Sequence, residues 1–84
     1  MEVIWSPRAL KQLTKLKDRQ ARKRIVLAVR ALSGFPDVHG VKTLKNHRYG
    51  YGLRVGNYRV LFDVLDHARI ISIEEVRKRD ERTY

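Results

Sequence analysis

Apolar and other side chains alternate on both sides of Gly56-Asn57, a pattern that predicts two antiparallel strands joined by a two-residue turn. Glycine and asparagine tolerate the positive φ that such a turn requires. With the turn at these two residues, Arg54 faces Arg59 across the hairpin. Because side chains alternate between the faces of a sheet, both arginines lie on one face and the apolar residues on the other. We place these strands at residues 49–55 and 58–64.

Two earlier stretches carry apolar residues at helical spacing, at residues 7–17 and 18–33. Ser6 is a favoured N-cap for the first helix, and Asp18 has the same role for the second. Gly34 is a suitable C-terminal stop for the second helix. The short link predicts an antiparallel helical hairpin.

Two further strands are predicted at residues 2–5 and 69–76, where β-branched residues are concentrated. Ile70 and Ile71 are consecutive, which indicates burial on both faces and hence a central strand. The stretch 35–47 is expected to be irregular. The predicted order is β-α-α-β-β-β, with a last helical turn as an option. This order corresponds to an α+β fold in which a helical hairpin packs on a small, mostly antiparallel sheet.

The chain has 84 residues, so we expect a single domain, 1–84, with a modest core. Its formal net charge is +10. A charge of this size points to a polyanionic partner, which is a nucleic acid, an acidic protein or an anionic membrane. The basic sides of the two helices are either part of such a surface or an ordinary solvated face.

Several functional classes are excluded or disfavoured by composition. The absence of cysteine excludes disulfides, thiolate metal sites and thiol catalysis. The three histidines lack metal-ligand spacing and are expected in exposed loops, so no metal or cofactor is predicted. The N-terminus does not resemble a signal peptide, and no apolar run is long enough to cross a membrane. We therefore expect a cytoplasmic protein.

The facing arginines are the first candidate site. Like charges placed opposite each other destabilise a hairpin, so Arg54 and Arg59 are expected to share an anion, with phosphate the natural candidate. The alternative is two solvated arginines on an exposed face. Gly50 and Gly52 fall on the same face, and glycine in a strand marks either a close approach of a ligand or a bulge. Basic residues also precede the hairpin and end the chain: Lys42, Lys45, His47, Arg48, Arg77, Lys78, Arg79 and Arg82.

Two motifs together resemble a known family. They are Leu-Arg-Val-Gly-Asn-Tyr-Arg-Val at 53–60, preceded by Lys45-Asn46, and the basic segment 76–84 that closes with Tyr84. The chain resembles, over its whole length, the RelE/ParE superfamily of bacterial type II toxins. The basic tail with its tyrosine is more similar to the RelE branch than to the ParE branch.

The resemblance implies a ribosome-dependent mRNA endonuclease that needs no metal and cuts the codon in the A site. It further implies a cognate antitoxin that wraps over the toxin, and hence a hetero-oligomer. In the RelE branch an arginine matching Arg59 contacts the scissile phosphate, an arginine matching Arg79 is implicated in catalysis, and a tyrosine near the end matches Tyr84. The spacing to this tyrosine is about one residue shorter here.

One departure concerns the base that takes the proton from the attacking hydroxyl. The member named RelE has two functional lysines in the second strand, where this chain has Gly50 and Gly52. The preceding basic segment could supply the missing charge. Tyr84 is a candidate base if neighbouring cations lower its pKa from about 10, and it could instead stack on a nucleobase. His47 is a second candidate base.

We therefore predict catalytic roles for Arg54, Arg59, Arg79 and Tyr84. RNA binding is predicted for Lys42, Lys45, His47, Arg48, Arg77, Lys78 and Arg82. Two alternatives stay open: a ParE-like inhibitor of DNA gyrase, which poisons by binding and has no catalysis of its own, and a non-catalytic RNA-binding relative.

Overall fold

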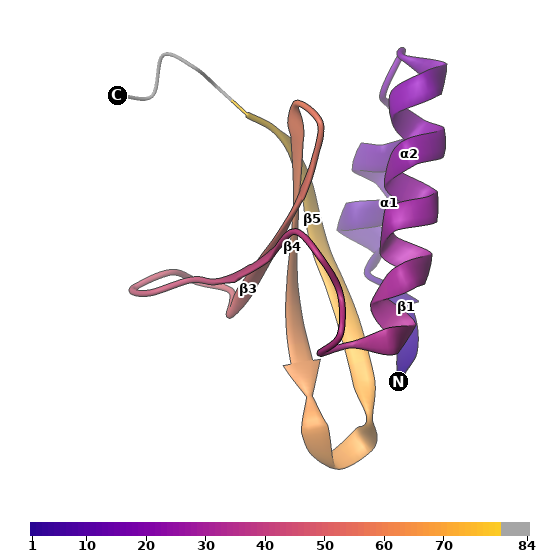
Figure 1. Cartoon of the computed structure of the whole chain (residues 1–84). Coiled ribbons are helices and arrows are strands. Elements are labelled where there is room, and N and C mark those ends of the chain that lie inside the picture. Colours follow the sequence, from indigo (N-terminus) through magenta and orange to yellow (C-terminus); the bar gives the residue numbers. More distant parts are fainter. Residues whose placement is uncertain (80–84) are drawn as a thin grey trace.

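The structure, a computed structural model, describes residues 1–79 (Figure 1). Its α-helices are α1 (Pro7–Thr14) and α2 (Arg19–Arg30), and short 3-10 helices follow at η1 (Ala31–Gly34) and η2 (Asp66–Ala68). Its strands are β1 (Glu2–Trp5), β2 (Val41–Thr43), β3 (Tyr51–Val55), β4 (Tyr58–Leu65) and β5 (Ile70–Lys78).

The five strands form one mixed sheet in the order β1-β5-β4-β3-β2. β1 runs parallel to β5, and every other pair of neighbours is antiparallel. Figure 1 shows α1 and α2 together on one side of this sheet. The predicted α+β fold, with a helical hairpin on a mostly antiparallel sheet, is confirmed. We call the sheet face turned away from the helices the outer face.

Both helices begin where their capping residues predict. The hydroxyl of Ser6 accepts a hydrogen bond from the Ala9 N–H at 3.0 Å, and the carboxylate of Asp18 accepts one from the Ala21 N–H at 3.1 Å. Both helices end earlier than predicted. α1 stops at Thr14 because the Leu16 N–H turns back to the Leu13 carbonyl, and α2 tightens into η1 after Arg30.

The hairpin has the predicted register, with Arg54 opposite Arg59 and Val55 opposite Tyr58. Gly56 takes a φ of 56°, as the first position of a type II′ turn requires. The apolar face of this hairpin packs beneath the helices. Phe62 is fully buried there, and its ring stacks on that of Tyr51 with centroids 5.3 Å apart.

β5 is a central strand, as predicted, and a β-bulge aligns its apolar residues. Leu61 pairs with Glu75 and Phe62 with Ile73, which leaves Glu74 as the extra residue. Without a bulge, Ile73 and Val76 would point to opposite faces, since they are three residues apart. With it, both are buried in the core.

Three of the predictions about strands were also wrong. The stretch 35–47 is not wholly irregular, because β2 forms a short edge strand that its alternation does not reveal. β5 runs two residues beyond 76, so Arg77 and Lys78 belong to the sheet and not to a tail. β3 begins at Tyr51, two residues later than expected, because residues 45–50 form a loop.

Candidate phosphate-binding face

Three arginines lie in one row across the outer face. Arg59 on β4 is the cross-strand partner of Arg54 on β3 and also of Arg77 on β5. All three are exposed. Directly opposed residues on neighbouring strands have Cβ atoms about 5 Å apart, so these guanidinium groups share one surface. We call Arg54, Arg59 and Arg77 the arginine row.

The position of Arg79 extends this basic surface toward the hairpin turn. Its N–H donates to the carbonyl oxygen of Asn57 at 2.7 Å, so the pairing of β5 with the hairpin continues past the end of the strand. Alternation places Arg79 on the same face as Arg77. Lys78 pairs with Tyr58 and so faces the opposite way, at the edge of the helical layer. The sheet therefore brings Arg79 to the arginine row and separates Lys78 from it.

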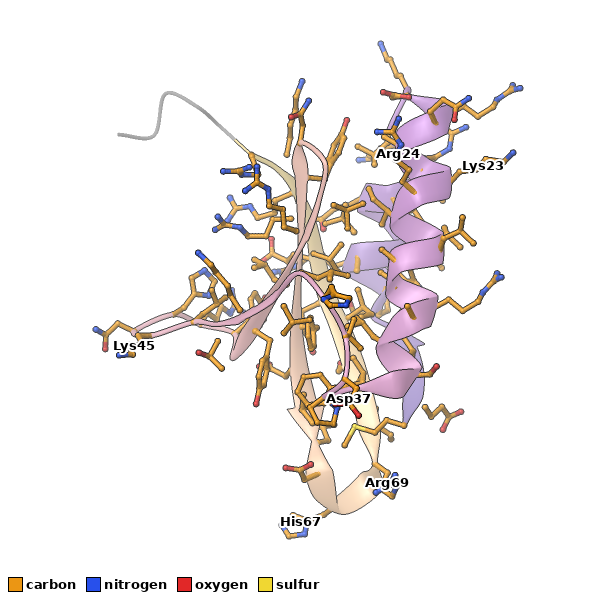
Figure 2. All side chains as sticks on the ribbon, in the orientation of Figure 1. Lys23, Arg24, Asp37, Lys45, His67 and Arg69 are labelled. Atoms are coloured by element: carbon orange, nitrogen blue, oxygen red, sulfur yellow. The ribbon has the colours of Figure 1, made fainter. Side chains whose placement is uncertain are left out.

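The other basic residues before the hairpin lie in a loop with defined ends. The Leu44 N–H donates to the Gly50 carbonyl at 2.9 Å, which closes the loop. The Gly50 N–H in turn donates to the carboxylate of Asp63 on β4 at 2.6 Å. Three exposed basic residues lie between these anchors: Lys45, His47 and Arg48. In Figure 2, Lys45 lies at the far end of the loop, on the side away from Lys23 and Arg24 of α2.

Tyr49 fixes the base of this loop. It is buried although it lies outside the main core, and its N–H donates to Nδ1 of His47 at 3.1 Å. The guanidinium of Arg48 lies 5.5 Å from the centre of the Tyr49 ring, within the range of a cation–π contact. This hydrogen bond to Nδ1 thus holds the His47 imidazole against the backbone of its own loop.

One carboxylate lies at the edge of the arginine row. Glu75 has one oxygen 3.9 Å from Arg77 and the other 3.9 Å from Arg8 at the start of α1. Its side chain is only 14% exposed. Within residues 1–79, no carboxylate lies at ion-pair distance from Arg54 or Arg59. Within residues 1–79, no carboxylate therefore neutralises the positive charge at the centre of the arginine row.

A hollow of about 290 Å³ opens between the first turn of α1 and the basic loop. Arg8 and Arg48 line it together with two carboxylates, Asp63 and Glu74. No sequence motif singles out Arg8 or Asp63, because Asp63 reaches this region through the register of β4 and Arg8 through the first turn of α1.

Lys42 is an exposed residue of β2, whereas two other predicted site residues lie outside the described part of the chain. Both Tyr84 and Arg82 belong to residues 80–84, so their predicted roles stay predictions. Among residues 1–79, no group of three or more histidine or acidic side chains is arranged to hold a metal ion. Nor is any helix in that range both long enough and apolar enough to span a bilayer.

Comparison with solved structures gives strong matches to bacterial toxins. The toxin–antitoxin complex RelBE2 of Mycobacterium tuberculosis is 25% identical with a TM-score of 0.78, and the match covers 93% of this chain and 96% of that one. The isolated E. coli RelE toxin is 19% identical with a TM-score of 0.79, covering 98% and 87%. A YoeB/ParE toxin from Agrobacterium tumefaciens is 16% identical with a TM-score of 0.77, covering 95% and 100%.

No curated protein matches the sequence. A family model does, and it covers residues 3–83, nearly the whole chain. That model describes the ParE toxin of type II toxin-antitoxin systems, parDE. Together with the shared fold, this match shows that the chain belongs to the ParE toxin family of the RelE/ParE superfamily, the toxins of type II toxin–antitoxin systems.

Proposed function

We propose that this toxin is a ribosome-dependent endoribonuclease that cuts mRNA in the A site. The observation that carries the proposal is the arginine row, in which Arg59 has an arginine on each side and Arg79 nearby. Opposed like charges weaken a sheet unless an anion is shared between them. A phosphodiester is an anion that planar guanidinium groups bind well.

The chemistry requires no metal. The 2′-oxygen attacks the adjacent phosphorus, so that a P–O2′ bond forms and the P–O5′ bond breaks, leaving a 2′,3′-cyclic phosphate. The base takes the proton from the 2′-hydroxyl, and an acid gives one to the leaving 5′-oxygen. Arg54 and Arg59 stabilise the extra negative charge that develops on the phosphorane. His47 and Tyr84 are the candidates for the base.

Two classes of partner accompany this function. A cognate antitoxin is proposed because the matched structures include complexes of RelE toxins with RelB antitoxins. An acidic segment of such a protein would neutralise part of the net charge of +10. The ribosome would hold the mRNA in the geometry for attack, which lowers the demand on the toxin's own acid–base groups.

A second candidate function is inhibition of DNA gyrase. The matching family model carries the name ParE, and this observation favours the ParE-like alternative. Such a toxin acts by binding, so the arginine row would bind a partner without cutting it. A non-catalytic RNA-binding relative would use the same surface without toxicity.

Primer extension on mRNA in a purified translation reaction, with and without ribosomes, tests the proposal. We expect cuts inside codons that require ribosomes and that disappear in Arg59→Ala. Arg30→Ala is the matched control, since it removes the same charge from the exposed side of α2. If the parent makes no cuts but blocks supercoiling by gyrase, the ParE-like function is correct and the nuclease proposal is wrong.

A further inference from the structure

Gly52 has no side chain on the outer face, and the stem of Arg59 lies over it, so that Gly52 is buried. A Cβ atom on Gly52 would be 3.7 Å from Cγ of Arg59 and 3.6 Å from its Cδ. The stem of Arg59 therefore leaves its own strand, β4, and crosses onto β3. The stem therefore points across β3, in the direction of the sheet edge formed by β2.

Lys42 is the residue that β2 places beside this spot. It pairs directly with Gly52, so it lies on the outer face and the bases of the two residues are about 5 Å apart. Lys42 is exposed, and among residues 1–79 no carboxylate lies at ion-pair distance from it. An ammonium from β2 and a guanidinium from β4 can therefore share the space over Gly52 that lies outside the Arg59 stem covering this glycine.

Leu44 separates this space from the basic loop. Its Cδ1 lies 3.7 Å from the same Cβ position on Gly52, on the loop side of Lys42. The loop then carries Lys45 away to its far end (Figure 2). Among the basic residues that precede the hairpin, strand register therefore favours Lys42 as the one that joins Arg59.

We propose that Lys42 and Arg59 together bind one phosphate group over Gly52, outside the Arg59 stem that covers this glycine. The guanidinium fork donates two parallel hydrogen bonds, and the flexible ammonium supplies a point charge from the opposite side. The identity of that phosphate as part of an RNA chain rests on the proposed function. In that reaction Lys42 is a further cation on the phosphorane, in addition to Arg54 and Arg59.

Inorganic phosphate is the probe for this site, because its binding does not depend on cleavage. In an NMR titration we expect the Cε resonance of Lys42 and the Nε–H resonance of Arg59 to shift with the same Kd. Lys42→Ala should weaken that Kd about tenfold, as loss of a charged hydrogen bond does. Lys42→Arg should keep most of the affinity. Lys23→Ala is the matched control, because Lys23 is an exposed lysine on α2, and it should leave the Kd unchanged.

A second variant tests the geometry without changing any charge. Gly52→Val fills the spot on which the Arg59 stem lies, so phosphate binding should weaken although every cation is present. The proposal is overturned if phosphate shifts Arg59 but not Lys42, or if Lys42→Ala binds phosphate as the parent does.

Cleavage by the same variants separates this inference from the proposed function. We expect Lys42→Ala to cut ribosome-bound mRNA at least tenfold more slowly than Lys23→Ala does. Equal cutting by these two variants would keep the nuclease function and reject the role of Lys42. A protein in which phosphate shifts both residues, but which makes no ribosome-dependent cuts, would keep the phosphate site and reject the nuclease function.

Discussion

Arg59 and Arg77 are direct cross-strand partners on two neighbouring strands, although 18 positions separate them in the sequence. Their pairing turns an arginine pair on one hairpin into a row that spans three strands. It also places the carboxylate of Glu75 at the edge of this row, since Glu75 forms an ion pair with Arg77 on β5. The charge of the outer face therefore depends on Arg77 and Glu75 of β5 as well as on the two arginines of the hairpin.

Glu75→Gln should strengthen RNA binding with little effect on stability. Both ion pairs of Glu75 are long, at 3.9 Å, and their arginine partners are more than half exposed. The free energy of unfolding in urea should change by less than about 1 kcal/mol. RNA affinity, measured by fluorescence anisotropy, should rise several-fold at low salt and converge with the parent at high salt. Asp37→Asn removes a charge elsewhere, and an equal gain from it would contradict this local explanation.

Phe62→Ala should be among the most destabilising substitutions in the core. Phe62 is fully buried, stacks on Tyr51 and meets the edge of Phe35 at 6.2 Å. The loss of packing should cost about 3–5 kcal/mol in the urea-derived free energy of unfolding. The control is Leu27→Ala, because Leu27 is 60% exposed and should change stability by less than about 0.5 kcal/mol. Similar losses from both variants would refute this assignment of the core.

Asp63→Ala should loosen the basic loop at its base. The variant removes the acceptor of the 2.6 Å hydrogen bond from the Gly50 N–H. We expect faster hydrogen exchange at the Gly50 amide and a loss of about 1–3 kcal/mol in stability, as is typical for a bond to a charged group. Asp63→Asn keeps an acceptor oxygen, so its exchange rate and its stability should lie between those of the parent and those of Asp63→Ala. Unchanged exchange in Asp63→Ala would show that the loop is held by other contacts.

Gly56→Ala should destabilise the hairpin. Gly56 has a φ of 56°, and a Cβ in that region costs about 1–2 kcal/mol. Thermal or urea unfolding measures the effect, and Gly56→Asn should lose less because asparagine tolerates this conformation. Gly34→Ala is the control, since Gly34 has an ordinary φ and no atom near its Cβ position. Equal losses of stability in Gly56→Ala and Gly34→Ala would show that the hairpin does not contain the turn described here.

Local features were predictable from the sequence. The turn at Gly56-Asn57 determines the register of its own hairpin, so the pairing of Arg54 with Arg59 followed directly. The caps at Ser6 and Asp18 likewise act on residues three positions away. In each case the deciding interaction is made within a few residues of the signal.

Long-range register was not predictable. Arg77 reaches Arg59 because β5 continues past 76 and because Glu74 is a bulge, and neither feature has a local signal. β2 escaped prediction because it is three residues long and mostly exposed. The pairing of Lys42 with Gly52 depends on that strand. For this reason the sequence alone could not distinguish Lys42 from the other basic residues that precede the hairpin.

The strand order has a consequence for how this toxin is made. β5 lies inside the sheet, between β1 and β4, yet it is the last strand within residues 1–79. During synthesis the first strand has no partner until residues 70–73 have left the ribosome, and Arg59 lacks one of its neighbours until residue 77 has done so. Because Arg59 and Arg77 are distant in sequence, the arginine row is completed late in synthesis. A nascent chain therefore presents the complete arginine row only after residue 77 has left the ribosome.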